Sequence, residues 1–357
     1  MNDWPRAILH LDMDAFFVNV HVLDHPEDAG IPLVVGGRPE NRGVVASASY
    51  EARQFGIRSA MPSKTAVRLC PDLKIVSANW DRVRECSRQV MDILRQYGPV
   101  EKMSVDEAYI DLSGQANPEE VAAEMKTAVT TQIHLPCSVG LAASKLVAKV
   151  ASDHDKPDGF TVVPPGREAA FLAPLPTRAL WGIGPKTAEK LARQGITTCG
   201  QLAAADLSTL RRAVRSHAEP LQRRAAGIDS RPVQVDRGPA KSISQEWTFN
   251  EDVSDPEVLR ESLQKMCERV AQSIQKRQLL AHTVTVKFRW ADFTTYTRQK
   301  TVEVGFDDTQ TLYALAHALW QEHWPRDKKL RLLGVGVGNL EKPMVRQLGF
   351  DFFTERP

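Results

Sequence analysis

The chain has 357 residues, of which 42% are hydrophobic and 25% charged, a composition typical of a folded globular protein with about two to four domains. Its five cysteines are scattered without a CxxC pair, which argues against a disulfide framework or a zinc site and fits a reducing cytosol. The sequence has neither a basic-then-apolar leader nor an apolar run of about 18 residues, so we expect neither secretion nor a membrane span.

The formal net charge of +2 hides an uneven distribution of charge along the chain. Residues 1–166 carry 17 basic and 22 acidic side chains, residues 167–240 carry 12 and 6, and residues 241–357 carry 17 and 16. An acidic front followed by a basic middle is typical of a metal site beside a phosphate-binding surface. A solvated charged face is the alternative explanation of the same pattern.

The first half of the chain predicts a β-α-β-β-α-β order, which is the split βαβ arrangement. Strands are expected at 7–13, 100–104, 108–112 and 136–141, and helices at 83–97 and 118–133. An insertion at about 26–77 is rich in Gly, Arg and Ser and predicts a small separate lobe.

The second half begins differently and then repeats the same order. Residues 175–230 predict short helices joined by Gly-containing turns, and 231–243, with two prolines and several basic groups, predicts a linker. Strands are then expected near 242–249, 282–290, 296–304 and 331–338, and helices near 255–278 and 309–324. Ser254 and Glu257 have the spacing of a capping box at the start of the first of these helices.

Strand 282–290 alternates between two kinds of side chain, so we expect it to have two different faces. One face would carry His282, Val284, Val286, Phe288 and Trp290, and the other Thr283, Thr285, Lys287 and Arg289. The first face predicts a core. The second could lie along a phosphate backbone, with an ordinary solvated face as the alternative.

Three carboxylates are expected to meet in the first half of the chain. Asp12 ends an apolar strand, and Asp106 with Glu107 lies in the tight connection of a hairpin, on a strand adjacent to the first in a split βαβ sheet. With no obvious base beside them, divalent cations would best neutralise them, and two Mg²⁺ ions about 4 Å apart could activate a hydroxyl, with the Met13 carbonyl as a further ligand. Each piece alone is more often structural, and we interpret Asp14 as a helix N-cap.

Five longer segments carry a family resemblance: HLDMDAFF (10–17), ASYEARQFGIRSAMP (48–62), SVDEAYIDL (104–112), GLAASKLVAKVASDHDKPDG (140–159) and WGIGPKTAEKL (181–191). In this order they resemble the Y-family translesion DNA polymerases, most closely the bacterial DNA polymerase IV branch. The resemblance implies a multi-domain α+β fold, a right-hand polymerase with a split-βαβ (ferredoxin-like) palm and a helix–hairpin–helix thumb. It implies a palm at 1–25 and 78–166, fingers at 26–77, a thumb at 167–230, a linker at 231–241, a β-α-β-β-α-β little finger at 242–343 and a clamp-binding tail at 344–357.

The implied activity is template-directed DNA synthesis of low fidelity, in which a primer 3′-hydroxyl attacks a dNTP and pyrophosphate leaves, with two Mg²⁺ ions per active site. No proofreading exonuclease is visible in the sequence. The implied partners are primer–template DNA, dNTPs and the sliding (beta) clamp. We expect a monomer that has no membrane contact and works on DNA in the bacterial cytoplasm.

The resemblance also assigns residues. The catalytic carboxylates are Asp12, Asp106 and Glu107, which with Met13 hold the metals. The dNTP contacts are Phe16, Phe17, Ser47, Tyr50, Arg53 and Lys156. Phe17 stands at the steric gate, where an aromatic ring excludes a 2′-hydroxyl, while Phe16 belongs with the core. Tyr50 and Arg53 are spaced i, i+3, so they share one face of a helix.

DNA contacts are implied in two further places. In the thumb, Gly182 and Gly184 permit a turn whose amides bind a phosphate, and Lys186 and Lys190 add charge. In the little finger the implied contacts are Lys287, Arg289, Arg298 and Lys300. The C-terminal QLGFDF segment resembles a clamp-docking peptide through Gln347, Leu348, Phe350 and Phe352, with a frayed apolar tail as the alternative.

Two departures from the family pattern stand near the nucleotide. Residues 18–21 (VNVH) replace a stretch of small residues that commonly ends in glutamate, and Ser47 replaces a threonine while keeping the hydroxyl. Two other functions compete with the polymerase. A non-catalytic DNA- or clamp-binding adaptor would not need the three carboxylates with Tyr50 and Arg53, and a nucleotide cyclase would not need the basic hairpin.

Overall fold

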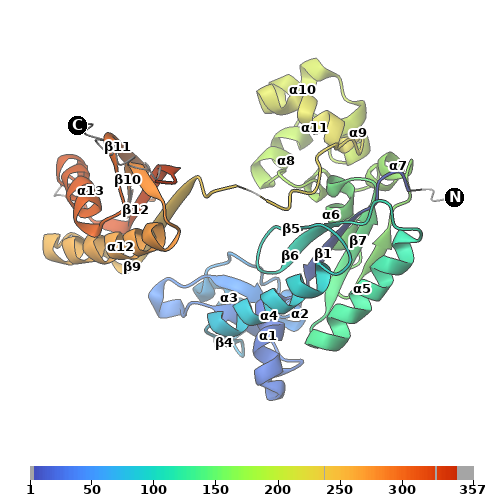
Figure 1. Cartoon of the computed structure of the whole chain (residues 1–357), viewed down its shortest axis with the longest axis horizontal. Coiled ribbons are helices and arrows are strands. Elements are labelled where there is room, and N and C mark those ends of the chain that lie inside the picture. Colours follow the sequence, from blue (N-terminus) through green and yellow to red (C-terminus); the bar gives the residue numbers. More distant parts are fainter. Residues whose placement is uncertain (1–3, 237, 326–327, 344–357) are drawn as a thin grey trace, which may run out of the picture. The chain divides into compact units, whose positions relative to one another are not determined.

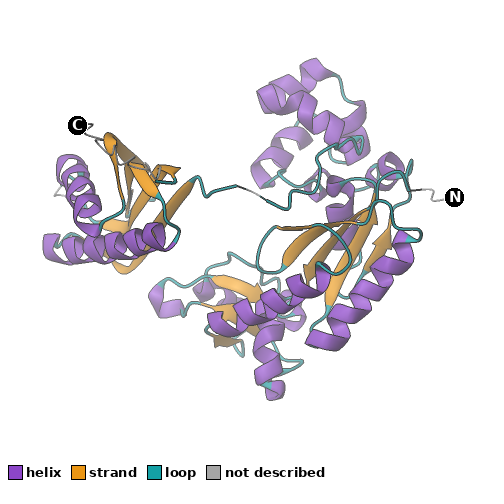
Figure 2. Cartoon of the chain, viewed as in Figure 1, coloured by secondary structure: helices purple, strands orange, loops and turns teal. Residues whose placement is uncertain are grey.

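The computed structural model describes residues 4–236, 238–325 and 328–343. The chain forms two compact units, one of Met1–Pro39 with Gly43–Arg237 and the other of Glu40–Arg42 with Gly238–Pro357. Figure 1 labels the elements along the chain, and Figure 2 shows that both units mix helices and strands. The predicted α+β class is therefore confirmed.

A five-stranded sheet, which we call the central sheet, organises the first unit with the strand order β5-β6-β1-β7-β8. Its strands are β1 (Ile8–Met13), β5 (Val100–Lys102), β6 (Glu107–Asp111), β7 (Cys137–Ala142) and β8 (Phe160–Val162). With helices α4 (Trp80–Leu94) and α5 (Pro118–Ile133) they give the predicted β-α-β-β-α-β order, to which β8 adds a parallel edge strand. Strand β1 pairs antiparallel with β6 and β7, so the expected adjacency of the first and third strands is confirmed.

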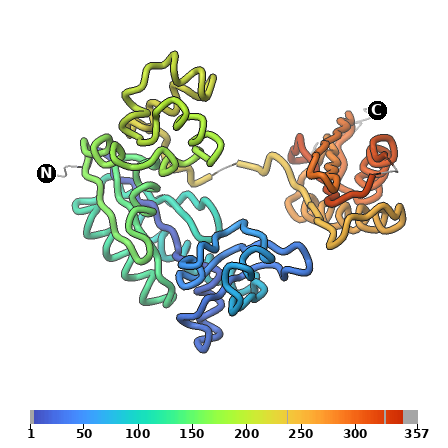
Figure 3. Tube along the Cα trace, turned by 180° about the vertical axis from the view of Figure 1, so that it is seen from behind, coloured from blue at the N-terminus to red at the C-terminus, as the bar shows by residue number. Residues whose placement is uncertain are grey.

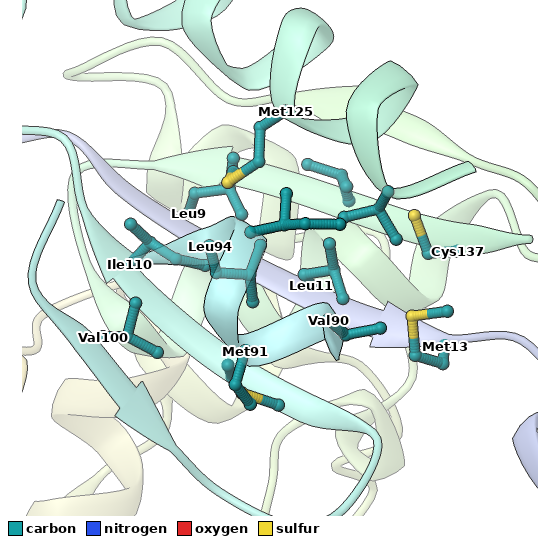
Figure 4. Close-up of a cluster of buried hydrophobic side chains, with 14 of the residues drawn as sticks. Leu9, Leu11, Met13, Val90, Met91, Leu94, Val100, Ile110, Met125 and Cys137 are labelled. Carbon is teal, nitrogen blue, oxygen red and sulfur yellow. The ribbon is translucent and has the colours of Figure 1, made fainter. Parts of the chain in front are cut away.

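Helices cover both faces of the central sheet. Leu9 and Leu11 of β1 pack into one cluster with residues of α4 and α5, and Figure 4 shows these side chains interdigitating. Ile8 belongs to a second cluster, with residues of α6 (Lys145–His154) on the opposite face. Each such buried side chain stabilises the fold by about 1.5–3 kcal/mol. Strand β1 is thereby fixed, and Asp12, which shares the face of Ile8, is directed towards α6.

The insertion at 26–77 forms a sheet and a small core of its own. Strands β2 (Leu33–Gly36), β3 (Val45–Ala48) and β4 (Lys74–Val76) lie in the order β3-β2-β4. The helical elements before and within it are α1 (Phe16–Asp24), η1 (Pro26–Asp28), η2 (Pro39–Asn41), α2 (Tyr50–Gln54) and α3 (Ser63–Leu69). This arrangement brings α1 and the start of α2 beside the end of β1.

Short helices follow the central sheet, as the sequence predicts. They are α7 (Glu168–Leu172), η3 (Thr177–Ala179), α8 (Pro185–Ala192), α9 (Cys199–Ala204), α10 (Leu207–Val214), η4 (Arg215–His217) and α11 (Ala218–Ala225). Side-chain caps define where several of them begin: Thr198 forms a capping box with Gln201, and Asp206 accepts a hydrogen bond from the amide of Thr209.

The second unit repeats the β-α-β-β-α-β order, as predicted, and Figure 3 shows its trace in orange and red. Its elements are β9 (Ser242–Val253), α12 (Pro256–Lys276), β10 (Leu280–Trp290), β11 (Thr295–Phe306), α13 (Thr309–His323) and β12 (Leu330–Glu341), with the sheet order β11-β10-β12-β9. The predicted capping box at Ser254 and Glu257 is wrong. Helix α12 begins one residue later, because the Asp255 carboxylate accepts the amide hydrogen of Glu257 and Pro256 occupies the first turn.

Strand β10 has the two predicted faces over most of its length. Val284, Val286, Phe288 and Trp290 are buried against α12 and α13, and the residues between them are partly exposed. The prediction fails at His282, which is partly exposed. A register irregularity between Ala281 and Thr283 turns Ala281 into the core instead, and the His282 ring bonds to Glu341.

Candidate active site

Two carboxylates face each other at one end of the central sheet. Asp12 on β1 is the register partner of Glu107 on β6, so their side chains leave the same face of the sheet. The amide of Met13 donates to the carbonyl of Asp106 at 3.0 Å, which seats the hairpin connection against the end of β1. The structure thus brings together Asp12 and Glu107 as the sequence predicts.

A lysine lies between the two carboxylates, so the expectation that no base stands beside them is wrong. The Lys149 ammonium on α6 donates to Asp12 Oδ2 at 2.8 Å and to Glu107 Oε1 at 2.7 Å. Lys156 lies 2.5 Å from Asp12 Oδ1, and Asp153 contacts both lysines. Lys149 stands inside the quoted 140–159 segment, and its i, i+7 spacing to Lys156 was the signal that could have revealed it.

This cluster divides the charge unequally between the two acids. Burial alone would raise the pKa of Asp12, but its hydrogen bond with Glu107 and the two ammonium groups hold that pKa well below its usual range. Burial and the same hydrogen bond raise the pKa of Glu107 to about 7. Burial would lower the pKa of Lys149, but the carboxylates of Asp12, Asp153 and Glu107 raise it above its usual range. Asp12 is therefore ionised at neutral pH. Glu107 holds its proton over part of the neutral range, and a bound metal cation would displace that proton.

The carboxylate of Asp106, the third predicted ligand, bonds to Ser104. The Ser104 hydroxyl donates to this carboxylate and accepts the amide hydrogens of Asp106 and Glu107. Within the described residues no group of three or more His, Cys, Asp or Glu side chains is arranged to hold a metal ion. The oxygen ligands of Asp12 and Glu107 have the chemistry that Mg²⁺ prefers, and two ammonium groups already compensate charge there. The donor set fits a divalent cation once the lysines withdraw and Asp106 turns.

Asp14 does not cap a helix as predicted. Helix α1 begins after Ala15, which makes no side-chain cap, and Asp14 is buried at 1% exposure. Its carboxylate accepts from Ser138 Oγ at 2.9 and 3.0 Å, from the Asp158 amide at 2.8 Å and from the Tyr50 hydroxyl at 3.2 Å. Asp14 therefore joins the β1 end to β7, to the 156–158 loop and to α2.

The two adjacent phenylalanines of α1 differ in burial. Phe16 is buried in the central core at 2% exposure, so its predicted contact with a nucleotide would have to come from its backbone. Phe17 is partly exposed, and its ring meets the ring of Trp80 edge-on at 5.3 Å between centroids. The expectation that Phe16 belongs to the core is confirmed, and Phe17 packs, partly buried, against two hydrophobic clusters.

Tyr50 and Arg53 lie on one face of α2, as the i, i+3 spacing predicts. The Arg53 guanidinium stacks 4.4 Å over the Tyr50 ring, and its Nε donates to the Ala48 carbonyl at 3.1 Å. Burial and the Asp14 carboxylate raise the pKa of Tyr50 to about 12, so this hydroxyl stays protonated and remains a donor. Ser47, on β3, is buried at 7% exposure.

The predicted hairpin turn precedes α8. Gly182 has φ +93°, a conformation that favours glycine, and Gly184 is the N-cap residue of α8. Lys186 and Lys190, both on α8, are exposed. Together with arginines of η4 and α11, this turn borders a hollow whose lining is Gly182, Thr187, Lys190, Ala213, Val214, Arg215, Ser216, His217, Pro220, Leu221 and Arg224.

The polar face of the second sheet is an open groove. Lys287 and Thr285 of β10 lie opposite Gly334 and Gly336 of β12, whose missing side chains deepen the face. Lys287 bonds to Glu246 of β9 at 2.8 Å. Arg289 lies on the same face, since it is two residues further along β10.

Arg298 and Lys300 are exposed but do not extend this polar face, and their contact with DNA stays a prediction. They are the register partners of Val286 and Val284, so they leave the sheet on the side that α12 and α13 cover. The Arg298 guanidinium stacks near the Tyr296 ring at 5.6 Å on that side. The residues of β11 that share the polar face are Thr295, Thr297, Gln299 and Thr301.

The predicted clamp contacts Gln347, Leu348, Phe350 and Phe352 lie outside the described residues. Among the described residues, none of the helices is both long enough and apolar enough to cross a lipid bilayer.

Comparison with protein families gives three consecutive matches. The model of the impB/mucB/samB family matches residues 11–153, the model of the IMS family HHH motif matches 165–196, and the model of the impB/mucB/samB C-terminal domain matches 240–350. The first contains Asp12, Glu107 and Lys149 and ends before Lys156, and the second contains the turn before α8.

Relatives and solved structures agree with these matches. DNA polymerase IV of Dehalococcoides mccartyi (strain CBDB1) is 40% identical over 97% of this chain and 90% of that protein. DNA polymerase IV of Listeria monocytogenes serotype 4b (strain F2365) is 39% identical over 95% of this chain and 96% of that protein. Among solved structures, a Y-family DNA polymerase chimera of Dbh and Dpo4 superposes with a TM-score of 0.85 and 26% identity, over 94% of this chain and all of that one.

Proposed function

The chain belongs to the impB/mucB/samB family and is a Y-family, DNA-directed DNA polymerase of translesion synthesis, and we propose that Asp12, Asp106 and Glu107 form its catalytic centre. The observation that carries this assignment is the pairing of Asp12 with Glu107 across the two central strands of the palm. This pair of partly buried acids, which the ammonium groups of Lys149 and Lys156 contact, supports the proposal of a cation site.

Catalysis depends on divalent cations, and we propose that these are two Mg²⁺ ions. Asp12 and Glu107, with Asp106 and the carbonyl of Met13, would supply the oxygen ligands. When bound, the ions supply charge that lowers the pKa of the primer hydroxyl and stabilises the leaving pyrophosphate. For this, Lys149 must release both carboxylates and Ser104 must release Asp106, because these side chains hydrogen-bond to the proposed metal ligands.

Around that centre, the residues beside β1 are positioned for the nucleotide. Arg53 presents a planar, always-charged donor for a phosphate, and the protonated Tyr50 hydroxyl could exchange its bond with Asp14 for a second phosphate oxygen. Lys156 can exchange its bond with Asp12 for the triphosphate. Phe17 would lie against the sugar and exclude a 2′-hydroxyl, while Ser47 offers a hydroxyl beside Tyr50.

The reaction is then an in-line displacement. The primer 3′-oxygen attacks the α-phosphorus of the dNTP, the new P–O ester bond forms, and the bond to the pyrophosphate oxygen breaks. The side chains of this protein contribute position and charge rather than a covalent intermediate.

DNA contacts are proposed on both units. The amides of the Gly182–Gly184 turn, with Lys186 and Lys190, would bind a backbone phosphate without sequence preference. The polar face of the second sheet, with Lys287 and Arg289, would lie along the duplex backbone. Arg298 and Lys300 are left out of this surface, because the register places them on the other face.

The remaining assignments follow the family. We propose a palm at 1–25 and 78–166, fingers at 26–77, a thumb at 167–230, a linker at 231–241, a little finger at 242–343 and a tail at 344–357 that docks on the sliding clamp. We propose further that the protein acts as a monomer on DNA in the bacterial cytoplasm.

The test is extension of a labelled primer with dNTPs and Mg²⁺ by wild type, Asp106→Ala and Asp111→Ala. Asp111 lies on the same strand as Glu107 but at its far end, so it controls for the loss of a carboxylate. We expect the first variant to lose extension and to keep DNA binding, and the second to extend like wild type. Equal extension by wild type and Asp106→Ala would remove the proposed catalytic centre.

A further inference from the structure

The segment Asp229–Gln234, which we call the strap, is tied into the palm by side chains that the proposed catalytic centre does not use. The Asp229 carboxylate accepts the amide hydrogen of Leu146 at 3.0 Å. Arg6 donates to the carbonyls of Asp229 and Arg231. The strap therefore runs from the end of the short helices back to the central sheet and α6. It includes residues 231–234, which are the first four residues of the expected linker.

A buried ion pair fastens the other end of the strap. Lys145 of α6 and Glu101 of β5 lie 2.5 Å apart, and their side chains are 7% and 5% exposed. The same Glu101 oxygen accepts the amide hydrogen of Gln234 at 2.8 Å, and the Lys145 ammonium lies 3.4 Å from the carbonyl of Pro232. Removing either charge would take from the other its buried ion-pair partner. The pair therefore joins α6, β5 and the strap.

The helix that the strap fastens is the one that carries the lysine of the active site. Lys145 and Lys149 are one turn apart on α6 and point to the same face. Glu101 is the register partner of Tyr109, which is two residues from Glu107 on the same face of β6. The two ion pairs, Lys145 with Glu101 and Lys149 with Glu107, thus lie one after the other between α6 and the central sheet.

A cavity of about 220 Å³ lies beside these two ion pairs. Both pairs line it, together with His10, Trp181 and Arg231. Apolar residues of α6 pack against the central sheet, and beside this cavity the polar contacts of the strap add to that packing. Asp229 also lies at the N-terminus of α6, where a negative charge is favourable. Helix α6 ends at His154, two residues before Lys156.

We propose that the strap positions α6, and that Asp229, Glu101 and Lys145 are positioning residues for nucleotide addition. They hold Lys149 and Lys156 in register with the catalytic carboxylates. This inference rests on the proposed function, because the consequence of misplacing α6 is read in polymerase turnover. It adds a mechanical role for residues 229–234, which the family assigns to the thumb end and a linker.

The test uses the full chain and three variants. Asp229→Ala removes the acceptor of the Leu146 amide, and Asp229→Asn keeps an acceptor oxygen there. Asp206→Ala is the matched control, because Asp206 caps an amide of α10, which carries no active-site residue. Three quantities are measured: hydrogen exchange of the Leu146 amide, the Mg²⁺ dissociation constant without DNA, and single-turnover incorporation with DNA and dNTP affinities determined separately.

We expect Asp229→Ala to speed exchange at Leu146 and to lower the maximal incorporation rate on the order of tenfold, with DNA affinity unchanged. Asp229→Asn should recover most of the rate, and Asp206→Ala should match wild type. Faster exchange with an unchanged rate, or an equal loss in the Asp206 control, would overturn the inference.

If the wild-type protein fails to extend a primer, the proposed function fails. The Mg²⁺ dissociation constants measured without DNA then test whether the strap positions α6. Loosening α6 lets Lys149 leave Asp12 and Glu107 more easily, so Asp229→Ala should bind Mg²⁺ about threefold or more tightly than wild type. An unchanged dissociation constant would overturn the positioning role.

Discussion

Lys149 places one ammonium between two carboxylates that would otherwise repel each other inside the palm. Its distances of 2.8 Å to Asp12 and 2.7 Å to Glu107 are those of charge-assisted hydrogen bonds, and its side chain is only 14% exposed. A divalent cation at the same place would make the lysine dispensable. The free enzyme and the metal-loaded enzyme therefore compensate the same charge in two ways.

Lys149→Met should reveal this exchange in stability. Without this ammonium the pair keeps the contact of Lys156 with Asp12 but loses the cation that bridges both acids, so we expect the free energy of unfolding in a chelator to fall by about 3 kcal/mol. Mg²⁺ should restore more stability to the variant than it adds to wild type. Thermal unfolding with and without Mg²⁺ measures both effects.

Lys126→Met is the control, since Lys126 is similarly shielded at 17% exposure and pairs with Asp158 instead. A Mg²⁺ effect of equal size in wild type and Lys149→Met would contradict the exchange of lysine for metal.

Phe17 offers a second test at the level of one side chain. Its partly exposed ring packs edge-on against Trp80 and against two hydrophobic clusters, which restrict its movement. Phe17→Ala should raise ribonucleotide use relative to deoxynucleotide use by about 100-fold, through the loss of a steric clash. Incorporation of matched rNTP and dNTP measures the ratio. Phe55→Ala, which removes an exposed ring from the finger lobe, should leave it unchanged, and unchanged selectivity in Phe17→Ala would refute the gate.

Elements were predicted better than the contacts between them. The strand patterns gave both β-α-β-β-α-β orders, because apolar periodicity reports directly which residues a sheet buries. The pairing of Asp12 with Glu107 followed from that order alone. Lys149 was missed because its partner is 137 residues away from it in one case, and periodicity carries no information about such contacts.

Register explains what alternation could not show on the second sheet. The pairing of β10 with β11 is irregular between Ala281 and Thr283, where Ala281 and not His282 is buried, and a local alternation pattern cannot show such an irregularity. Arg298 and Lys300 look equivalent to Lys287 and Arg289 in sequence. Only the pairing with Val286 and Val284 shows that they leave the opposite face.

The two faces of this sheet can be separated by salt dependence. Each pair of basic residues is replaced by alanine, Lys287 with Arg289 in one variant and Arg298 with Lys300 in the other, so both lose two charges. We expect only the first to weaken DNA binding and to reduce the slope of log affinity against log salt by about 1 to 2. DNA binding over a series of salt concentrations measures the slope, and equal slopes for the two variants would contradict the assignment of the polar face.

At the scale of the whole molecule, the polymerase combines a palm centre with two proposed grips on DNA. The family matches follow one another along the chain, over residues 11–153, 165–196 and 240–350. The division of charge supports the same layout, with the acidic residues concentrated in the first 166 residues and the excess of basic residues in 167–240. Composition could predict that division, but not which arginines and lysines reach the DNA.

The tail supplies a prediction for the complete enzyme. Deleting residues 347–357 should remove the stimulation of synthesis by the sliding clamp while distributive synthesis stays at the wild-type level, because the proposed docking peptide lies apart from the palm in sequence. Primer extension with and without the clamp measures the difference. Equal stimulation of the full-length and shortened proteins would exclude this docking role.

The most direct test of the central claim is primer extension on a pair of templates, one undamaged and one with an abasic site, with dNTPs and Mg²⁺. We predict that the wild-type protein extends the primer on both templates, with Asp106→Ala binding the same DNA and extending neither. DNA binding by the wild-type protein without extension on either template would contradict the account, and would mean that the paired carboxylates serve the structure and not the chemistry.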